Sequence, residues 1–548
     1  MTKWADNINE KNVLGEYPRP LMRRKSYVNL NGIWKYAIRE TKGFPKKMDG
    51  DILVPFSPEA VLSGVNRQLK PEEYLWYKRR LPDEVKPEKG SRWILHFGAV
   101  DQCAVVYING KKQGKHVGGY LPFSYDITEA LKEEKNLLTV KVRDYSETCY
   151  YSRGKQKLKN GGMFYTAQSG IWQTVWIEKV PECYIGHLKI TPLYDQSSIM
   201  IQMEEEHGIK DIDYEVTITA RKMWPVKASG KTGKPCVIMI PHMRSWSPED
   251  PFLYDLHVRM GEDSVESYFA MRKVEVKNDK EGIARIFLNN EPYFEKGVLD
   301  QGYWPDGLYT PPCDEAMIYD IQKMKDLGFN MIRKHIKIEP QRWYYHCDRI
   351  GMLVWQDMVN GGREYKSWYV TWLATAMEGT HIRAKDTRLH LMGRQDPTGQ
   401  KQFESEMKET IRRLYNHPSV VTWVIFNEGW GQFKTRKMTD IALAEDHTRL
   451  IDSASGWFDQ GCGDIKSIHD YFFPLNITPE KRVTALTEFG GYSLQIPKHS
   501  MYEKDIYGYK IFKRKKDLSR AYEKLIKKLV IPNISRGLSA TVYTQLSD

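Results

Sequence analysis

The stretch from Val421 to Gly431 reads VTWVIFNEGWG, and it places an acid at the end of an apolar run. The residues from Val421 to Phe426 are apolar or β-branched, which is typical of a strand buried on both faces. An amide and a carboxylic acid, Asn427 and Glu428, follow at once. Because burying an unpaired carboxylate is costly, this order indicates a strand that ends where an acid is needed.

Strand-like and helix-like segments alternate on both sides of this stretch, over residues 278–548. Helical spacing covers 314–327, 340–350 and 403–415, and glycines follow the first two of these segments. Strand candidates lie at 293–299, 330–333, 352–355, 420–426, 456–458, 467–468, 485–487 and 540–543. This alternation predicts a (β/α)8 TIM barrel, and we expect the barrel to end after its eighth strand, where the sequence ends.

Two β-rich segments precede the predicted barrel. In residues 1–182, short alternating runs are separated by turn signals such as Asn109-Gly110, and this pattern favours a β jelly-roll sandwich. In residues 183–277 the alternation continues, and a segment of that length favours an immunoglobulin-like β-sandwich. The predicted fold class is therefore multidomain, with two sandwiches followed by a barrel.

Composition and charge narrow the class of protein. The net charge is +12, but the basic residues are spread along the 548-residue chain and no nucleic-acid motif accompanies them, so no nucleic-acid partner is expected. The sequence has no run of about 18 apolar residues, so no membrane span is expected. The N-terminus lacks the pattern of a signal peptide, which predicts a cytoplasmic protein, or a periplasmic one whose leader has been removed. The seven scattered cysteines predict neither a disulfide framework nor a zinc site.

Polar residues follow nearly every strand of the predicted barrel, where a TIM barrel has its active site. Two glutamates, Glu428 and Glu488, each follow an apolar run and face one predicted pocket. Paired carboxylates suit glycoside hydrolysis, in which one protonates the leaving oxygen and the other attacks the anomeric carbon or activates water. The other candidate residues are Asn427, Arg333, His335, Asp357, His469, Tyr471, Trp430 and Tyr543.

Several motifs together resemble glycoside hydrolase family 2, the family of β-galactosidases, β-glucuronidases and β-mannosidases. FNEGW at 426–430 and TEFGG at 487–491 resemble its acid/base and nucleophile motifs. LNGIW at 30–34, GGYLPFSYDIT at 118–128 and SGIWQTVWIE at 169–178 resemble its sugar-binding jelly roll, and WSPEDPFLY at 246–254 resembles the end of its immunoglobulin-like domain. Their order and spacing cover essentially the whole chain.

The resemblance implies a role for each principal residue. Glu428 would be the general acid/base, and Glu488 the nucleophile that forms a glycosyl-enzyme with retention of configuration. Asn427 would hydrogen-bond the sugar 2-hydroxyl. Arg333 would keep Glu488 ionised, because an adjacent cation lowers the pKa of a carboxyl, and Tyr471 would hydrogen-bond the same nucleophile.

The remaining residues receive secondary roles from the resemblance. His335, Asp357 and His469 would contact substrate hydroxyls, although each has a structural alternative as a core histidine or a supporting hydrogen-bonding group. Trp430 would raise the pKa of Glu428 by burying it, and Tyr543 would form the pocket floor. No metal or cofactor is expected. The expected partner is an oligosaccharide, polysaccharide or other glycoside, and a homo-oligomer is compatible with the family.

Two departures from the family pattern keep the substrate open. Phe164 stands where many relatives carry an acid that reaches the sugar 4-hydroxyl, and KGVLDQGYWPDG at 296–307 replaces the commoner first-strand motif. The leading expectation is hydrolysis of terminal β-D-galactosides. The alternatives are a β-glucuronidase or α-L-arabinopyranosidase of the same family, and a non-catalytic carbohydrate-binding protein. An aromatic-rich insertion at 359–402 is expected either to form a small core or to wall the pocket.

Overall fold

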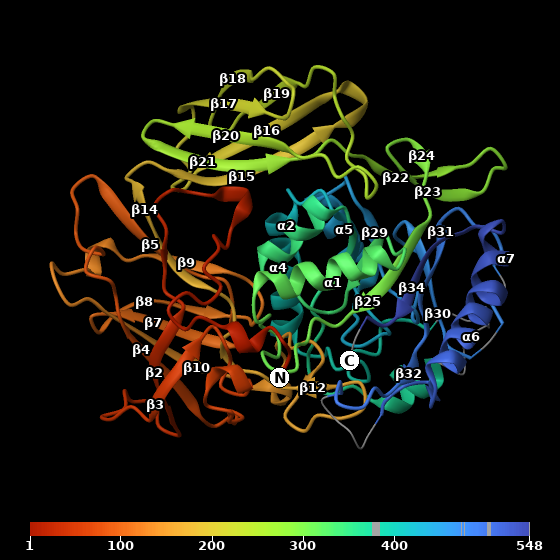
Figure 1. The fold of residues 1–548 in the computed structure, drawn as a ribbon, viewed down its shortest axis with the longest axis horizontal. Helices are drawn as coiled ribbons and strands as arrows, with labels where there is room; N and C mark the ends of the chain where they lie inside the picture. Colours follow the sequence, from red (N-terminus) through yellow and green to blue (C-terminus); the bar gives the residue numbers. More distant parts are fainter. Residues whose placement is uncertain (375–383, 473, 476, 501–505, 547–548) are drawn as a thin grey trace.

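The computed structural model describes residues 1–548 except 375–383, 473, 476, 501–505 and 547–548. Figure 1 shows three bodies: a β-sandwich coloured red to orange, a second sandwich in yellow and olive above, and a barrel in green to blue. The predicted multidomain fold class is confirmed, with a jelly-roll sandwich, an immunoglobulin-like sandwich and a TIM barrel. The exact domain boundaries at 182 and 277 stay predictions.

Two sheets enclose the core of the first sandwich. Their inward-facing side chains, including Trp34, Tyr77 and Phe97, form one buried hydrophobic cluster. One sheet has the order β1 (Val28–Asn29), β14 (Val175–Pro181), β5 (Ser91–Phe97) and β9 (Phe123–Asp126). The other has the order β3 (Gly50–Val54), β2 (Gly32–Arg39), β4 (Tyr74–Arg80), β10 (Leu137–Arg143), β7 (Cys103–Ile108) and β8 (Lys111–Val117). Two short pairs, β6 (Val100–Asp101) with β13 (Gly170–Ile171) and β11 (Gln156–Lys157) with β12 (Tyr165–Thr166), complete this body.

The second sandwich packs a three-stranded sheet on a four-stranded one. Along β20 every second residue is buried, which is the alternation that the sequence predicts for a sheet with one solvated face. The sheets are β15 (Ile185–Leu193), β16 (Ser198–Glu205) and β19 (Pro235–Met239), and β18 (Val226–Lys231), β17 (Asp213–Thr219), β20 (Tyr254–Met260) and β21 (Asp263–Phe269). A small sheet of β22 (Val274–Asn278), β23 (Ala284–Leu288) and β24 (Glu291–Pro292) leads into the barrel.

Eight parallel strands form the barrel, in the order β29-β28-β27-β26-β25-β34-β31-β30. They span β25 (Glu295–Asp300), β26 (Met331–Lys334), β27 (Leu353–Asp357), β28 (Val420–Val424), β29 (Leu450–Asp452), β30 (Ile465–Asp470), β31 (Val483–Gly490) and β34 (Leu538–Thr544). The barrel closes between β29 and β30, where the Ile451 N–H donates to Asp464 Oδ2 and the Asp464 N–H donates to the Ile451 carbonyl, each at 2.8 Å. The helices are α1 (Asp314–Asp326), α2 (Gln341–Ile350), α4 (Pro397–Leu414), α5 (Thr435–Glu445), α6 (Lys515–Leu525) and α7 (Ile531–Ile534).

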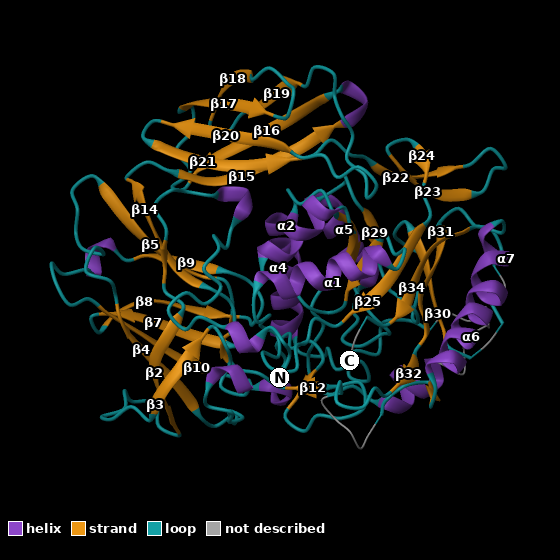
Figure 2. Ribbon diagram, in the orientation of Figure 1, coloured by secondary structure: helices purple, strands orange, loops and turns teal. Residues whose placement is uncertain are grey.

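Local sequence sets the ends of these helices. Asp396 caps α4 by accepting hydrogen bonds from the backbone N–H groups of Thr398 and Gly399, and Pro397 occupies the first helical position. Helix α2 ends at Gly351, whose φ of +82° is the left-handed conformation that glycine adopts without strain. Figure 2 shows α1, α2 and α4 between the first sandwich and the barrel strands. Among the described residues, no helix combines the length and the apolar composition that crossing a membrane requires.

The fifth barrel strand lies six residues before its predicted place. The sequence predicts a strand at 456–458, but β29 spans Leu450–Asp452 and pairs with β28 through Thr422–Leu450 and Val424–Asp452. Gly456 and Phe458 have φ values of +79° and +60°, which a strand does not allow. No helix lies among the described residues between β29 and β30, or among those between β30 and β31. Fewer barrel strands are therefore followed by a helix than the alternation predicted.

Buried ion pairs join the two sandwiches. Arg24 donates to both oxygens of Asp263, at 3.0 and 2.9 Å, and to Glu178 at 3.0 Å. Arg19 also donates to both oxygens of Glu178. Burial raises the pKa of Glu178, but Arg19, His96 and Arg24 outweigh burial and hold it well below its usual range. Glu178 is therefore an anion that holds Arg19 and Arg24 within the first sandwich, and the Arg24–Asp263 pair crosses to the second sandwich.

Replacing Glu178 tests this interface. Glu178→Gln leaves Arg19 without its carboxylate and Arg24 with Asp263 alone, so we expect the free energy of unfolding at pH 7 to fall by about 3–5 kcal/mol. Because the folded pKa of Glu178 is depressed, its contribution is present above the unfolded value of about 4.5 and is lost as pH falls below it. Denaturant unfolding measures the loss.

Glu88→Gln is the matched control, since Glu88 pairs with Lys179 on the exposed face of the same sandwich. An exposed ion pair contributes about 0–1 kcal/mol to the free energy of unfolding. The free energy of unfolding of this variant should therefore stay close to that of the wild type. Equal destabilisation by the two variants would contradict a special role for the buried network.

Candidate active site

The predicted acids converge at the carboxyl ends of the barrel strands. Glu428 follows β28, Glu488 lies near the end of β31, and His469 lies in β30 between them. One oxygen of each glutamate and one ring nitrogen of His469 lie within 4.8 Å of one another. The structure therefore brings the two predicted carboxylates to one point.

The backbone at Glu428 is strained. Its φ is +51°, a left-handed conformation that residues other than glycine rarely adopt. The regular ladder of β28 ends at Val424, yet the Glu428 N–H still donates to the Ser455 carbonyl at 3.0 Å. That hydrogen bond and the glycine that follows fix a turn which presents the carboxylate to the pocket. Strain of this kind concentrates at functional residues.

Arg333 is completely buried in β26 and organises three neighbours. Its Nε and Nη2 donate to the two oxygens of Asp357 at 2.9 and 3.0 Å, and Nη2 also donates to Asn427 Oδ1 at 2.8 Å. Its Nη1 donates to Glu488 Oε1 at 3.3 Å. Burial lowers the pKa of Arg333, but Asp357 and Glu488 outweigh burial and raise it. Arg333 is therefore a permanent cation beside Glu488.

The second oxygen of Glu488 receives a hydrogen bond from a tyrosine. Tyr471 donates from its hydroxyl to Glu488 Oε2 at 2.6 Å and lies 3.1 Å from Thr544 Oγ1. The Tyr471 ring stacks on Tyr509 at 3.8 Å between centroids, which fixes its direction. Both oxygens of Glu488 thus have a donor, as a nucleophile held in one orientation requires.

Glu428 is paired with a histidine. His469 Nδ1 lies 2.9 Å from Glu428 Oε1, and His469 Nε2 lies 3.0 Å from Ser455 Oγ. Burial lowers the pKa of His469, but Glu488 and Glu428 outweigh burial and raise it above 6.5. Burial raises the pKa of Glu428, yet the hydrogen bond and charge of His469 outweigh burial and lower it.

The expected raised pKa of Glu428 is therefore wrong for this structure. Burial beside Trp430 does act in the expected direction, but a protonated imidazole at 2.9 Å is the stronger effect. The Glu428–His469 pair can therefore hold a proton across the 2.9 Å contact. His469 and Glu428 are 41 residues apart, so the sequence contains no local signal of this pairing.

Several pocket groups have polar atoms without a hydrogen-bond partner among the described residues. His335 is buried, and neither ring nitrogen makes a well-directed hydrogen bond, although Nδ1 is 2.9 Å from Asp357. Burial lowers the pKa of His335 far below 6.5, so its ring is neutral. Trp430 Nε1 and both amide atoms of Asn360 are also unpartnered. Such groups match sugar hydroxyls, which donate and accept.

Tyr543 does not lie where the sequence predicted. Its ring packs against Tyr522 of α6 and against Phe489, with centroid separations of 5.0 and 5.6 Å. Phe489 and Tyr543 belong to the hydrophobic cluster that also contains Val530 and Leu525. Successive residues of a strand point to opposite faces, so the next residue, Thr544, faces the pocket and contacts Tyr471. The pocket floor therefore has Thr544 in place of Tyr543.

A loop of the first sandwich forms one wall of the pocket. The Gly154 N–H donates to the Asn360 carbonyl at 3.0 Å, and Tyr165 stacks on Tyr303 at 4.0 Å. Phe164 packs edge-on against Trp430, so it reaches the pocket as an apolar side chain in the predicted place of an acid. Asn360 is not among the site residues that the sequence predicted. The only sequence signal for it is its position shortly after the third barrel strand.

Lys155 in this loop brings a cation that the sequence did not single out. Burial raises the pKa of Glu428, and the charge of Lys155 helps His469 to lower it. For His335, burial lowers the pKa and the charge of Lys155 lowers it further. Lys155 is half-buried, and no carboxylate of the described residues lies within 4.0 Å of its Nζ. The pocket thus contains a positive charge that is not used in an ion pair.

The residue types of the acid cluster could also ligate a metal ion. Within the described residues, Glu428, His469 and Glu488 form the one group with this spacing. Both ring nitrogens of His469 already have hydrogen-bond partners, so neither has a lone pair directed at the shared space. The expected absence of a metal stays a prediction.

The insertion at 359–402 is described in part. Tyr369, Val370, Leu391 and Met392 form a small core with Phe458, and Tyr365 packs against it. Trp368 and Trp372 are exposed instead. The described portion therefore favours a mini-core over a stacking platform, although Tyr365 also packs on Trp430 at 6.1 Å and so forms part of the pocket wall. Residues 375–383 lie outside the described residues.

The chain is similar to known proteins in its family models, its sequence and its fold. Models described as glycosyl hydrolases family 2 match residues 65–181 (sugar binding domain), 183–272 and 312–487 (TIM barrel domain). A putative beta-glucuronidase of Formosa agariphila is 23% identical over 436 residues, covering 75% of this chain and 47% of the relative. A beta-galactosidase of Thermoanaerobacter pseudethanolicus is 24% identical over 510 residues, covering 85% and 61%.

The solved structures resemble the chain over nearly its full length. A beta-glucuronidase from an uncultured Clostridium species has a TM-score of 0.73 at 18% identity, covering 96% of this chain and 92% of the other. At 18% sequence identity, this similarity shows that the two chains share a fold and nothing more. The chain spans about half of the length of the first curated relatives that it matches.

The Glu428–His469 pair predicts the pH dependence of catalysis. As pH rises through the raised pKa of His469, above 6.5, the pair loses its proton and kcat/KM should fall. In His469→Gln the proton must reside on Glu428, so the basic limb should move to lower pH and kcat/KM near pH 7 should fall on the order of 100-fold.

The pH profile of kcat/KM for an aryl glycoside measures both effects. His335→Gln, which alters a pocket histidine outside the pair, serves as control and should lower activity without moving the limb. An unchanged limb in His469→Gln would contradict proton sharing by the pair.

Proposed function

Since the chain belongs to glycoside hydrolase family 2, we propose that it hydrolyses terminal β-glycosides with retention of configuration. The observation that carries this proposal is the approach of Glu428 and Glu488, whose nearest ligand oxygens lie within 4.8 Å. Retaining enzymes have carboxyl groups about 5–5.5 Å apart, whereas inverting enzymes need roughly 6.5–9.5 Å to admit water. The short separation favours a glycosyl-enzyme on Glu488.

The first step uses both carboxyl groups. A Glu488 oxygen forms a bond to the anomeric carbon while the bond from that carbon to the leaving oxygen breaks. His469 passes its proton to Glu428 across the 2.9 Å contact, and Glu428 delivers that proton to the leaving oxygen, which leaves Glu428 ionised and His469 neutral. In the second step Glu428 takes a proton from water and passes it back to His469, while the water oxygen displaces Glu488 from the anomeric carbon with a second inversion, which gives overall retention.

The neighbours of the acids support this division of roles. Arg333 and Tyr471 donate to different oxygens of Glu488, so they hold its carboxyl group in one orientation. Asn427 Oδ1 accepts from Arg333, which turns Nδ2 of the same amide toward the pocket as a donor for the sugar 2-hydroxyl. A hydrogen bond at that hydroxyl strengthens in the transition state.

For the sugar, the first candidate is a β-D-hexuronide such as a β-D-glucuronide. The unpaired cation of Lys155 favours a substrate with a carboxylate, and beta-glucuronidases are prominent among the similar proteins. The β-D-galactosides expected from the sequence are the second candidate, favoured by similar beta-galactosidases. Phe164 does not distinguish the two sugars. It is an apolar side chain at a position where the family pattern has an acid for both kinds of enzyme.

The activity is tested with a panel of 4-nitrophenyl β-glycosides. We expect release of nitrophenol by the wild type and loss on the order of 10⁴-fold or more in Glu488→Ala, because removal of a nucleophile prevents the covalent step. Azide should restore turnover of Glu488→Ala and yield an α-glycosyl azide. A wild-type chain that is inert on every sugar would favour the non-catalytic carbohydrate-binding alternative.

Sugar preference is tested at Lys155. Lys155→Gln should lower kcat/KM for the β-D-glucuronide on the order of 10–100-fold, since a charge-assisted hydrogen bond is worth about 1.5–3 kcal/mol, and should leave the β-D-galactoside nearly unchanged. Lys159→Gln, at an exposed position of the same loop, is the control. An equal loss of kcat/KM for both sugars would mean that Lys155 does not bind the substrate carboxylate.

A further inference from the structure

A chain of buried hydroxyl groups begins at Nε2 of His469, the ring nitrogen that does not bond Glu428. Ser455 Oγ lies 3.0 Å from Nε2, and the Ser455 hydroxyl donates to Thr487 Oγ1 at 3.1 Å. The Thr487 hydroxyl donates in turn to the Ile468 carbonyl at 3.2 Å. Ser455 and Thr487 are fully buried, and His469 is nearly so. The chain therefore ends at a backbone carbonyl inside the protein.

The carbonyl at its end sets the direction of each hydrogen bond in this chain. A carbonyl oxygen can only accept, and a hydroxyl has one hydrogen to donate. Thr487 uses its hydrogen on Ile468, so its oxygen accepts the hydrogen of Ser455. Ser455 has no second hydrogen, so its oxygen accepts from His469 Nε2. This direction requires a hydrogen on Nε2 whether the ring is charged or neutral.

A hydrogen on Nε2 leaves Nδ1 as the nitrogen that can exchange a proton. Nδ1 lies 2.9 Å from Glu428 Oε1. A charged ring can pass its Nδ1 hydrogen to Glu428 and become neutral. A neutral ring whose one hydrogen was on Nδ1 could not do so, because the loss would leave an anionic ring beside two carboxyl groups. The position of the second hydrogen therefore decides whether His469 can supply a proton.

Packing around the ring keeps Nε2 on Ser455. A Cβ added at Gly456 would lie 2.7 Å from His469 Cγ, so the ring rests directly on that backbone. Apart from Glu428, the one described acid within 4.0 Å of the ring nitrogens is Glu488, and its 3.7 Å from Nε2 is too long for a hydrogen bond. The titratable and charged groups around the ring are Glu428, Glu488, Asp357, Asp452, Arg333 and His335.

We propose that Ser455 and Thr487 are positioning residues that hold one hydrogen of His469 on Nε2 and so reserve Nδ1 for proton exchange with Glu428. The proposal rests on the proposed function, in which the Glu428–His469 pair supplies a proton in the first step and recovers one in the second. Once Nδ1 has given up its hydrogen, its lone pair faces the ionised carboxylate of Glu428. That repulsion makes the pair a strong base, ready to take a proton from the attacking water.

Removing the Thr487 hydroxyl tests the proposal through the pH profile of kcat/KM. In Thr487→Val the Ser455 hydroxyl loses its acceptor and can donate to Nε2, so a neutral ring can keep its hydrogen on Nδ1 and bond Glu428. Deprotonation of the pair becomes easier, and the basic limb should move to lower pH by about one unit, which corresponds to about 1.4 kcal/mol. Ser455→Ala removes the acceptor of Nε2 and should move the limb in the same direction. An unchanged limb in both variants overturns the proposal.

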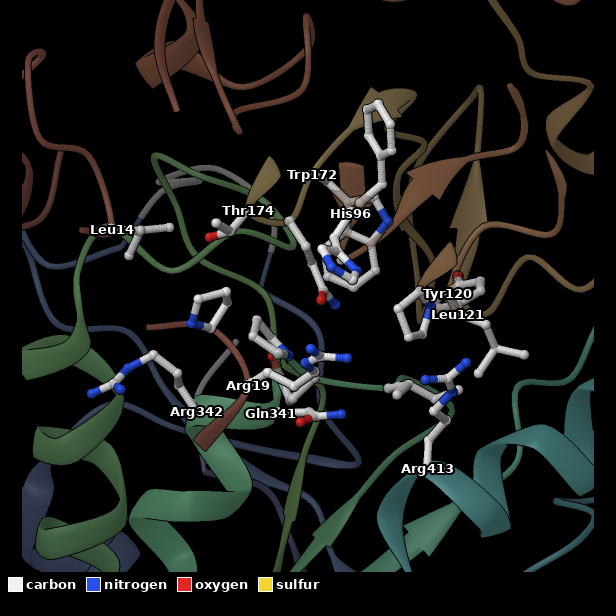
Figure 3. Close-up of a pocket in the computed structure, with 18 of the residues that line it drawn as sticks. Leu14, Arg19, His96, Tyr120, Leu121, Trp172, Thr174, Gln341, Arg342 and Arg413 are labelled. Carbon is white, nitrogen blue, oxygen red and sulfur yellow. The ribbon is translucent and has the colours of Figure 1, made fainter. Parts of the chain in front are cut away.

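Two further variants separate this effect from a loss of packing. Thr487→Ser keeps the hydroxyl, so its basic limb should stay at the wild-type pH even if its rate changes. Thr410→Val removes a similarly buried hydroxyl, which donates to the Glu406 carbonyl at 2.7 Å. Thr410 lines the cavity between the first sandwich and the barrel that Figure 3 shows, and no described residue of that lining belongs to the candidate active site. Thr410→Val should therefore leave kcat/KM and its basic limb unchanged, and an equal shift of the limb there would assign the effect to packing.

Nitrogen NMR of the ring tests the tautomer without catalysis. In the full chain labelled with nitrogen-15 histidine, the ring signals of His469 are those that disappear in His469→Gln. Above the pKa of His469 we expect the hydrogen on Nε2 in the wild type and in Thr487→Ser, and on Nδ1 in Thr487→Val. A wild-type ring with its hydrogen on Nδ1 overturns the proposal, even if aryl glycosides are hydrolysed. The expected tautomers support it even if the chain is inert on every glycoside, an outcome in which the proposed function alone fails.

Discussion

The buried guanidinium of Arg333 is the constraint on which the active-site end of the barrel depends. A cation with no exposure to water must be surrounded by acceptors, because an unpaired buried charge is not tolerated. Asp357 from β27, Asn427 after β28 and Glu488 from β31 supply those acceptors. Four strands are thus fixed relative to one another by one side chain, and Asn427 and Glu488, the two groups for which we propose contacts with the sugar, are oriented as a consequence.

The first sandwich is a structural part of the same pocket. Its loop bonds to the backbone of Asn360, and Phe164 and Arg153 pack on Trp430. The pocket wall is therefore assembled only when the sandwich docks on the barrel. The buried Arg24–Asp263 pair lies outside the pocket and joins the two sandwiches, and Glu178 holds Arg24 in place for it.

The sequence predicted the architecture and the two acids because both leave local signals. Apolar runs mark buried strands, and a carboxylate directly after such a run is rarely structural. The predictions that the structure contradicts also have local causes. Strand β29 is only three residues long, and its Asp452 interrupts the apolar pattern. Tyr543 and Thr544 are neighbours, so an error of one residue exchanges the pocket face for the outer face. Asn360 and Lys155 reach the pocket through tertiary contacts alone, which no periodicity encodes.

The charges of the pocket favour a proton on His469 in the proposed mechanism. Arg333 pairs with Asp357 and Glu488, and His469 lies 2.9 Å from Glu428 and 3.7 Å from Glu488. The two glutamates raise the pKa of His469 against the opposing effect of its burial. Attack by Glu488 on the anomeric carbon would convert its carboxylate into a neutral ester and so remove one of the two negative charges beside His469. The attraction that holds the proton on His469 would weaken at that moment, so transfer through Glu428 to the leaving oxygen would become easier when the mechanism requires it.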